Sequence, residues 1–83
     1  MHSARQVEVI IPAYNEEKRI GRTLASLVSL SEVKRILVVF EGNDRTPEIA
    51  KGFPKCEVYT ADRRLGKGGA IKKGIELADG SAK

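Results

Sequence analysis

The sequence is poor in the residues that mark several classes of protein. It has one cysteine and no tryptophan, and only two tyrosines and two phenylalanines are available for stacking on nucleic-acid bases. The single Cys56 excludes an internal disulfide and lacks the spacing of a metal site, so we interpret it as a buried strand residue in a reducing compartment. No apolar run approaches the roughly 18 residues that span a bilayer, and the first run contains Glu8, unlike a signal peptide. These absences favour a soluble globular chain.

A modest excess of positive charge is present, with 15 Lys and Arg against 11 Asp and Glu and a net charge of +4. Its distribution is more informative than its sum, because five basic residues gather in one short stretch: Arg63, Arg64, Lys67, Lys72 and Lys73. Such a cluster fits a di- or triphosphate as well as it fits a polynucleotide backbone. A solvated helix face is the alternative explanation for Lys72 and Lys73.

The first half of the chain predicts a strand, a helix and a second strand. Residues 7–11 and 36–40 are nearly continuous apolar runs rich in β-branched side chains, which is typical of strands covered on both faces of a parallel sheet. Asn15 is expected to cap the helix between them, with Glu16 and Glu17 complementing the helix dipole in the first turn. The apolar face of this helix recurs at helical spacing: Ile20, Leu24, Leu27 and Val28.

A second helix and a third strand are predicted next. Residues 46–51 are expected to form a short helix that Thr46 caps, with Pro47 at the favoured first helical position. Gly52 and a following proline should end this helix. A third strand is predicted over Cys56–Thr60.

A third helix completes the pattern. Residues 61–67 are expected to form a basic loop and residues 68–78 a helix, with Gly74 allowing close packing on the sheet and Gly80 as the C-cap. Three apolar residues of this helix share a face: Ile71, Ile75 and Ala78. The order βαβαβα is typical of a single α/β domain with a parallel sheet and right-handed crossovers.

The segments that follow the three strands carry unusual side chains. Ligands of an open parallel sheet bind beyond the carboxyl ends of its strands, here residues 12–16, 41–46 and 61–69. The first offers the Tyr14 ring to a base, the second acidic and amide acceptors, and the third cations beside glycines that can approach phosphate. Each motif alone is weak, because there is neither a P-loop nor a G-x-G-x-x-G. Their joint occurrence at one sheet edge favours a nucleotide site.

With these motifs in order, the chain resembles the family 2 glycosyltransferases of the GT-A fold, including polyprenyl-phosphate sugar synthases. The opening motif is Val9-Ile-Ile-Pro-Ala-Tyr-Asn-Glu16, and the basic glycine loop is Arg64-Leu-Gly-Lys-Gly-Gly-Ala70. The second-strand acidic motif is Val38-Val-Phe-Glu-Gly-Asn-Asp-Arg-Thr46. The match covers nearly all 83 residues. It implies a Rossmann-like, three-layer fragment of a GT-A domain over residues 1–83, with parallel strand order 3-2-1.

The resemblance also implies which residues would bind a nucleotide. The opening motif would line the nucleoside pocket with Pro12, Ala13, Tyr14 and Glu16. Glu41 would stand where the family has its base-contacting aspartate, beside Val39 and near Asp44, and Lys67 would lie near the diphosphate. The second motif departs from the family pattern, since Phe40-Glu41 replaces a pair of aspartates and the turn after it is one residue shorter.

The family's catalytic parts are not found in these 83 residues. No Asp-x-Asp metal motif occurs, and the family's general base and acceptor pocket lie beyond the point that corresponds to Lys83. By resemblance the full-length function is sugar transfer from a nucleoside diphosphate sugar, of UDP or GDP type, with Mg or Mn. We expect this chain alone to hold no metal, to supply no catalytic residue and to bind nucleotide weakly and without turnover, so whether it is an enzyme by itself stays open.

A competing hypothesis is a non-enzymatic scaffold. In a 3-2-1-4 sheet the first strand is interior, so without a fourth strand residues 7–11 form an unprotected apolar edge. Such an edge predicts a homo-oligomer or pairing with a missing C-terminal catalytic half. Nucleic-acid binding through the cluster from Arg63 to Lys73 is a third and disfavoured alternative. The absent signal and the family's donor supply predict a cytoplasmic location or the cytosolic face of a membrane.

Overall fold

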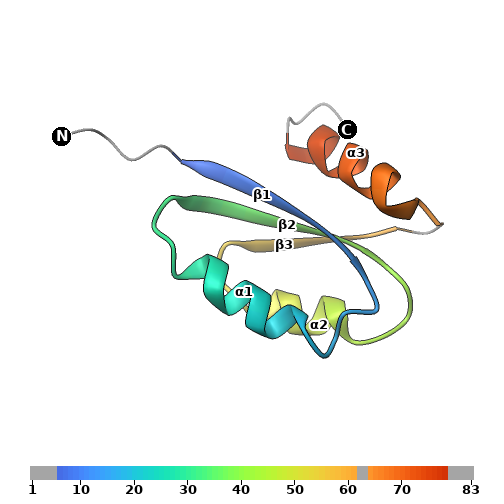
Figure 1. Ribbon diagram of the computed structural model, residues 1–83, viewed down its shortest axis with the longest axis horizontal. Helices are drawn as coiled ribbons and strands as arrows, with labels where there is room; N and C mark the ends of the chain where they lie inside the picture. Colours follow the sequence, from blue (N-terminus) through green and yellow to red (C-terminus); the bar gives the residue numbers. More distant parts are fainter. Residues whose placement is uncertain (1–5, 62–63, 79–83) are drawn as a thin grey trace.

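The computed structural model describes residues 6–61 and 64–78, which form three strands and three helices in strict alternation (Figure 1). The predicted βαβαβα order is therefore confirmed. The elements are β1 (Val7–Tyr14), α1 (Ile20–Val28), β2 (Val33–Glu41), α2 (Thr46–Lys51), β3 (Cys56–Thr60) and α3 (Gly66–Ala78).

The strands form one parallel sheet with β2 at its centre, in the order β1-β2-β3. This is the predicted order 3-2-1 read from the other side. Helices α1 and α2 cover one face of the sheet and α3 covers the other, so the fold has the expected three layers (Figure 1). No helix in the part of the chain that the structure describes has the length and apolar character to cross a membrane.

The central strand β2 supplies both halves of the core, which explains the unbroken apolar run over its residues 36–40. Its residues Ile36, Val38 and Phe40 pack with α1 and α2, whereas Leu37 and Val39 pack with α3. All five are at most 5% exposed. Full burial of one such side chain contributes on the order of 1.5–3 kcal/mol, so this strand anchors both helical layers.

Strands β1 and β2 are longer than predicted. β1 continues to Tyr14, past the predicted end at residue 11, and Pro12 lies opposite Val39 in the register. Proline lacks a backbone N–H and is tolerated on an edge strand. Within residues 6–61 and 64–78, β1 pairs with β2 alone and so provides that environment.

Helix α1 begins later than the sequence predicts, and Asn15 does not cap it. The backbone of Asn15 is left-handed, with φ of 49°, and its Oδ1 accepts a hydrogen bond from the Asn43 backbone N–H at 3.1 Å. The first turn of α1 contains no carboxylate, and Arg19 occupies the cap position without a side-chain hydrogen bond. The predicted cap is used instead to bind the neighbouring loop.

Thr46 was also wrongly predicted as a cap. It is the first helical residue of α2 and is fully buried, while Arg45 occupies the cap position. Pro47 lies in the first turn and Gly52 follows the last, as expected. Like the Asn15 side chain, the Thr46 hydroxyl accepts a hydrogen bond from a distant backbone amide, that of Glu16.

Helix α3 starts at Gly66, two residues before the predicted start, and small residues make up part of its packed face. Ile71 and Ile75 do share a face, but they are 40% and 54% exposed. The face on the sheet is Ala70, Gly74 and Leu77. As predicted, Gly74 permits close packing, because a Cβ there would collide with the side chain of Ile10. Gly80 lies outside the described residues.

Polar contacts tie the opposite end of the sheet together. Arg35 of β2 makes a bidentate ion pair with Glu57 of β3, with N–O distances of 3.0 and 2.7 Å, and lies 3.7 Å from Glu8 of β1. The Lys55 ammonium donates to the carbonyls of Val28, Leu30 and Val33. Cys56 is half-buried rather than buried, and this burial raises the pKa of its thiol.

We predict opposite effects from adding a methyl group at two glycines of α3. Gly74→Ala should lower the free energy of unfolding by about 1–3 kcal/mol, because the new Cβ meets Ile10 across a close-packed interface. Gly68→Ala should raise it by about 0.5 kcal/mol, because Gly68 has no atom within 4 Å of the added group and alanine favours the helix. Urea unfolding of both variants checks this, and equal effects would contradict the close packing at Gly74.

Candidate functional site

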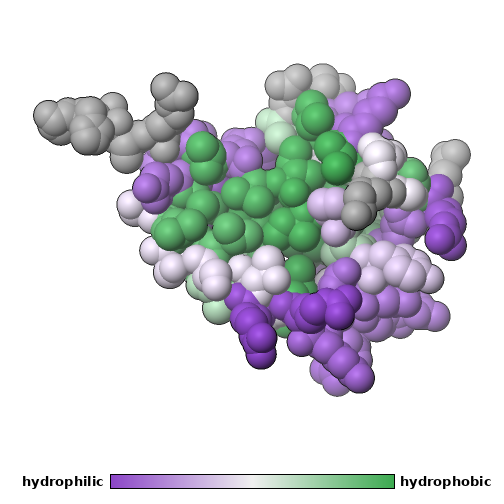
Figure 2. Space-filling view, in the orientation of Figure 1, coloured by the Kyte–Doolittle hydropathy of each residue, from purple (hydrophilic) through white to green (hydrophobic). Residues whose placement is uncertain are grey.

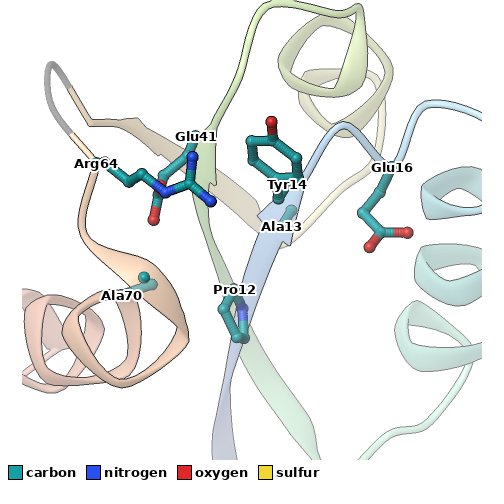
Figure 3. A pocket seen from close by; sticks show the side chains of 8 residues that line it. Pro12, Ala13, Tyr14, Glu16, Glu41, Arg64 and Ala70 are labelled. Atoms are coloured by element: carbon teal, nitrogen blue, oxygen red, sulfur yellow. The ribbon is translucent and has the colours of Figure 1, made fainter.

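A cavity of about 250 Å³ lies at the carboxyl ends of β1 and β2, beside the start of α3 (Figure 3). This is the sheet edge at which the sequence predicts a site. Ligands of open parallel sheets bind there because the strands end together and the following loops converge. The lining residues are Pro12, Ala13, Tyr14, Glu16, Glu41, Arg64, Gly66 and Ala70.

The strand ends bring an aromatic ring and a carboxylate next to each other. Tyr14 is the last residue of β1 and lies opposite Glu41, the last residue of β2, in the parallel register. The Tyr14 side chain is 56% exposed, so its ring is accessible to a ligand. Ala13 is only 3% exposed and belongs to the core under α1, which fixes the base of this strand end.

Glu16 reaches the cavity from the turn before α1. Its carboxylate Oε1 accepts a hydrogen bond from Arg19 Nε at 2.9 Å and forms a salt bridge with the same guanidinium. Its backbone carbonyl accepts from the amides of Arg19 and Ile20, each at 2.8 Å. Glu16 is therefore held by its own turn as well as by the neighbouring loop.

Arg64 is a lining residue that the sequence analysis did not assign to the site. Its guanidinium carbon lies 5.6 Å from the centroid of the Tyr14 ring, the geometry of a cation–π contact. In Figure 3 the side chain extends from the α3 side towards Tyr14. The signal was present in the sequence, because Arg64 belongs both to the basic cluster and to the glycine-loop motif. Gly66 and Ala70, also unassigned, complete this wall.

Of the residues predicted for the site, Val39 and Asp44 do not line the cavity. Val39 is fully buried and packs in the core under α3. Asp44 instead accepts hydrogen bonds from the Glu17 amide in the loop after β1 and from the Thr46 amide at the start of α2. Lys67 is the second residue of α3, and its side chain lies outside the described part of the structure.

Four hydrogen bonds join residues 15–17 to residues 43–46, and we call this set the loop clamp. Each segment donates two backbone N–H groups to side chains of the other. The bonds run from Glu16 N to Thr46 Oγ1 (2.9 Å), Glu17 N to Asp44 Oδ2 (3.0 Å), Asn43 N to Asn15 Oδ1 (3.1 Å) and Arg45 N to Glu17 Oε1 (2.9 Å). The two loops above the cavity therefore hold one another in place.

The Asp44 carboxylate accepts three hydrogen bonds. Its Oδ1 accepts from the Thr46 amide at 2.9 Å and from the Thr46 hydroxyl at 2.7 Å, in addition to the Glu17 amide at Oδ2. Desolvation by itself would raise the pKa of this carboxyl, but the hydrogen bonds from Thr46 and from the Glu17 amide outweigh it and lower the pKa. Asp44 is thus held as a carboxylate for a structural purpose.

Glycine is the residue type that suits position 42, between the end of β2 and the clamp. Its φ is 122°, a conformation that side chains rarely adopt. A Cβ at this position would also collide with the side chain of Asn15, which lies across the turn. Glu41 and Asn15 are therefore brought together by a turn that excludes any larger residue.

The arrangement suits a planar, hydrogen-bonding and anionic ligand better than it suits a metal ion. The cavity is lined by an aromatic residue, two acidic residues and an arginine, and the Glu16 carboxylate is itself paired with Arg19. Within the described ranges, 6–61 and 64–78, no three His, Cys, Asp or Glu side chains come together as metal ligands. The residues present therefore do not fit the divalent ion that the resemblance implies for full-length relatives, and we assign them no step through it.

Comparison with known proteins gives a family match over almost the whole chain. The sequence model described as Glycosyl transferase family 2 matches residues 8–82. Glycosyltransferase AglD of Haloferax volcanii is 35% identical over 90% of this chain, and the dolichyl-phosphate beta-glucosyltransferase of Homo sapiens is 33% identical over 86% of it. A 4,4'-diaponeurosporenoate glycosyltransferase of Staphylococcus aureus is 34% identical over 76% of it.

The matched relatives are much longer proteins. The chain spans 14% of the Haloferax protein, 27% of the human protein and 17% of the Staphylococcus protein. No solved structure matches the chain at a significant level.

We predict that Asp44 makes the stability of the fold depend on pH. Because hydrogen bonding lowers its pKa in the folded state, its contribution should be complete above its ordinary value of 3.8 and be lost as the pH falls through the lower folded value. Asp44→Asn should therefore be less stable than the natural chain at pH 6, and the difference should shrink at pH 2. Denaturant unfolding at both pH values checks this, and a constant difference would contradict a role for the charge.

Proposed function

This chain belongs to glycosyl transferase family 2, and on that premise we propose that its cavity binds the nucleoside diphosphate part of a sugar donor. The observation that carries the proposal is the convergence of Tyr14, Glu41 and Arg64 on one cavity at the carboxyl edge of a parallel sheet. Each of these groups matches a different part of such a donor. The relatives that match the chain include proteins named as glycosyltransferases, which supports the same activity class.

The chemical match can be followed group by group. The exposed Tyr14 ring offers a face on which a base can stack, and stacking of this kind tolerates different bases. The Glu41 carboxylate accepts hydrogen bonds from base N–H groups or ribose hydroxyls. Arg64 supplies a planar cation that can bind phosphate oxygens in a bidentate manner. Val39 would then support the site through core packing, and Asp44 would support it through the loop clamp.

The cavity suits part of a donor better than a whole one. Its volume of about 250 Å³ is at or below the roughly 300–1,000 Å³ typical of small-molecule sites. A nucleoside diphosphate sugar would therefore extend past the cavity, and we place its sugar end outside the described residues. The proposed contribution of this chain is donor binding in a GT-A arrangement.

For the complete reaction, we propose transfer of the sugar to an acceptor of the polyprenyl phosphate class, because one relative is named a dolichyl-phosphate beta-glucosyltransferase. The Mg or Mn ion of such a reaction and the general base that activates the acceptor would come from outside these 83 residues. The isolated chain should then bind nucleotide without transferring sugar. The location that follows is the cytosol or the cytosolic face of a membrane, where such donors are supplied.

We predict that Tyr14 carries the stacking part of nucleotide binding. In an amide NMR titration with UDP and GDP, shifts should cluster at Tyr14, Glu41 and Lys67. Tyr14→Leu should weaken binding about tenfold, because it removes the aromatic face. Tyr14→Phe keeps the ring and should bind like the natural chain. The absence of shifts at millimolar nucleotide would overturn the proposed function.

A second candidate function, self-association, is favoured by the apolar edge of the sheet. Figure 2 shows apolar side chains gathered over β1, and Val7 of this strand is 41% exposed. The exposed Ile71 and Ile75 of α3 lie on the helix that packs against Ile10 of β1. An unpaired apolar strand is a template for another strand. We propose that two copies pair through β1 about a two-fold axis, which would make the pairing antiparallel and the sheet continuous.

We predict that this association can be broken by a charge on β1. Light scattering at high concentration should give the mass of two copies or more for the natural chain. Val7→Lys should give one copy, because an edge lysine blocks strand addition, whereas the β-branched and uncharged Val7→Thr should still associate. A monomeric mass for the natural chain at high concentration would remove this candidate.

A further inference from the structure

Arg64 lies over a face of the Tyr14 ring, the ring on which the proposed base would stack. Its guanidinium carbon lies 5.6 Å from the Tyr14 centroid, inside the ~6 Å range of a cation–π contact. Because both side chains line the same cavity, the guanidinium contacts the ring from the cavity side (Figure 3). A stacked base needs that same space.

The two occupants of the ring face therefore exclude each other. Aromatic rings stack with centroids roughly 4.5–7 Å apart, which is the distance at which Arg64 now lies. Arg64 is exposed and precedes α3 by two residues, so its long side chain can leave the ring without a movement of the helix. A base entering the cavity has to displace the guanidinium, whose new position depends on what else the ligand carries.

We propose that Arg64 exchanges partners on ligand binding, from the Tyr14 ring in the free chain to the diphosphate in the bound chain. This inference rests on the proposed function. The diphosphate carries the charge that attracts a guanidinium, and Arg is suited to bidentate contact with phosphate oxygens. The base then occupies the ring face that the guanidinium has left, while Tyr14 itself stays in place, held between β1 and the loop clamp.

The exchange makes Arg64 a selector for phosphorylated ligands. A nucleoside without phosphate has to break the cation–π contact and offers the guanidinium no anionic partner in return. A nucleoside diphosphate breaks the same contact and replaces it with a stronger one. Removing the positive charge should therefore affect the two ligands in opposite directions, which a simple ligand contact would not do.

The test compares Arg64→Gln with the natural chain in binding uridine and UDP, and guanosine and GDP, followed by the NMR shifts of the Tyr14 ring and amide. Arg64→Gln should bind the nucleosides about two- to fivefold more tightly, because the competing cation–π contact is gone. It should bind the diphosphates about tenfold more weakly, because a charged hydrogen bond is lost. Arg22→Gln on α1, which removes an exposed arginine elsewhere, should change neither affinity.

The outcomes separate this inference from the proposed function. Opposite changes support the exchange, and Tyr14 ring shifts in ligand-free Arg64→Gln support the contact itself. Weakening of both ligands would make Arg64 an ordinary contact and overturn the exchange while the nucleotide site stands, and so would unchanged affinities. If the natural chain binds none of the four ligands, the proposed function fails and the exchange fails with it.

Discussion

The loop clamp between residues 15–17 and 43–46 fixes the positions of the two loops at the carboxyl ends of β1 and β2. It joins the segments that follow β1 and β2, so the ring of Tyr14 and the carboxylate of Glu41 are positioned together. Thr46 lies at its buried centre, where one hydroxyl donates to Asp44 and accepts from the Glu16 amide. Because this buried hydroxyl both donates and accepts a hydrogen bond, it leaves no unpaired polar group. Loss of either bond would destabilise the loops.

The clamp also explains why Asn15 keeps an unfavourable backbone conformation and why a glycine is found at position 42. Asn15 and Gly42 both have positive φ, and for a residue with a side chain this costs roughly 1–2 kcal/mol. Asn15 is one of the residue types that tolerate this conformation, and its side chain then reaches the Asn43 amide. The collision that any Cβ at Gly42 would make is with this same Asn15 side chain. The positive φ of Asn15, its hydrogen bond to the Asn43 amide and the glycine at position 42 are therefore parts of one feature.

The sequence could predict those parts of the fold that depend on the pattern of apolar residues, but not those that depend on hydrogen bonds between distant residues. The apolar runs correctly predict the parallel sheet, and β3 was predicted at its observed bounds. Asn15 and Thr46 have the local signature of helix caps, yet the folded chain uses both side chains in the clamp. In the site, the parallel topology correctly predicts that the segments containing Tyr14 and Glu41 lie at one sheet edge, although both strands end later than predicted. Two features of the site could be known only from the packed structure. They are the burial of the Val39 side chain in the core and the approach of Arg64 to the Tyr14 ring.

The cavity therefore has one wall fixed by the clamp and another fixed by helix packing. Ala70 and Gly66 line the second wall, and Gly74, one turn beyond Ala70, touches Ile10 two residues before Pro12. Because nothing larger than glycine fits at this contact, the closeness of α3 to β1 sets the width of the cavity and brings Arg64 within reach of Tyr14. The packed elements thus hold the Tyr14 ring and the start of α3 at a fixed separation, and the long, exposed side chain of Arg64 reaches from one to the other. Under the proposed exchange, the Arg64 side chain would move according to the charge of the ligand while the fold stays unchanged.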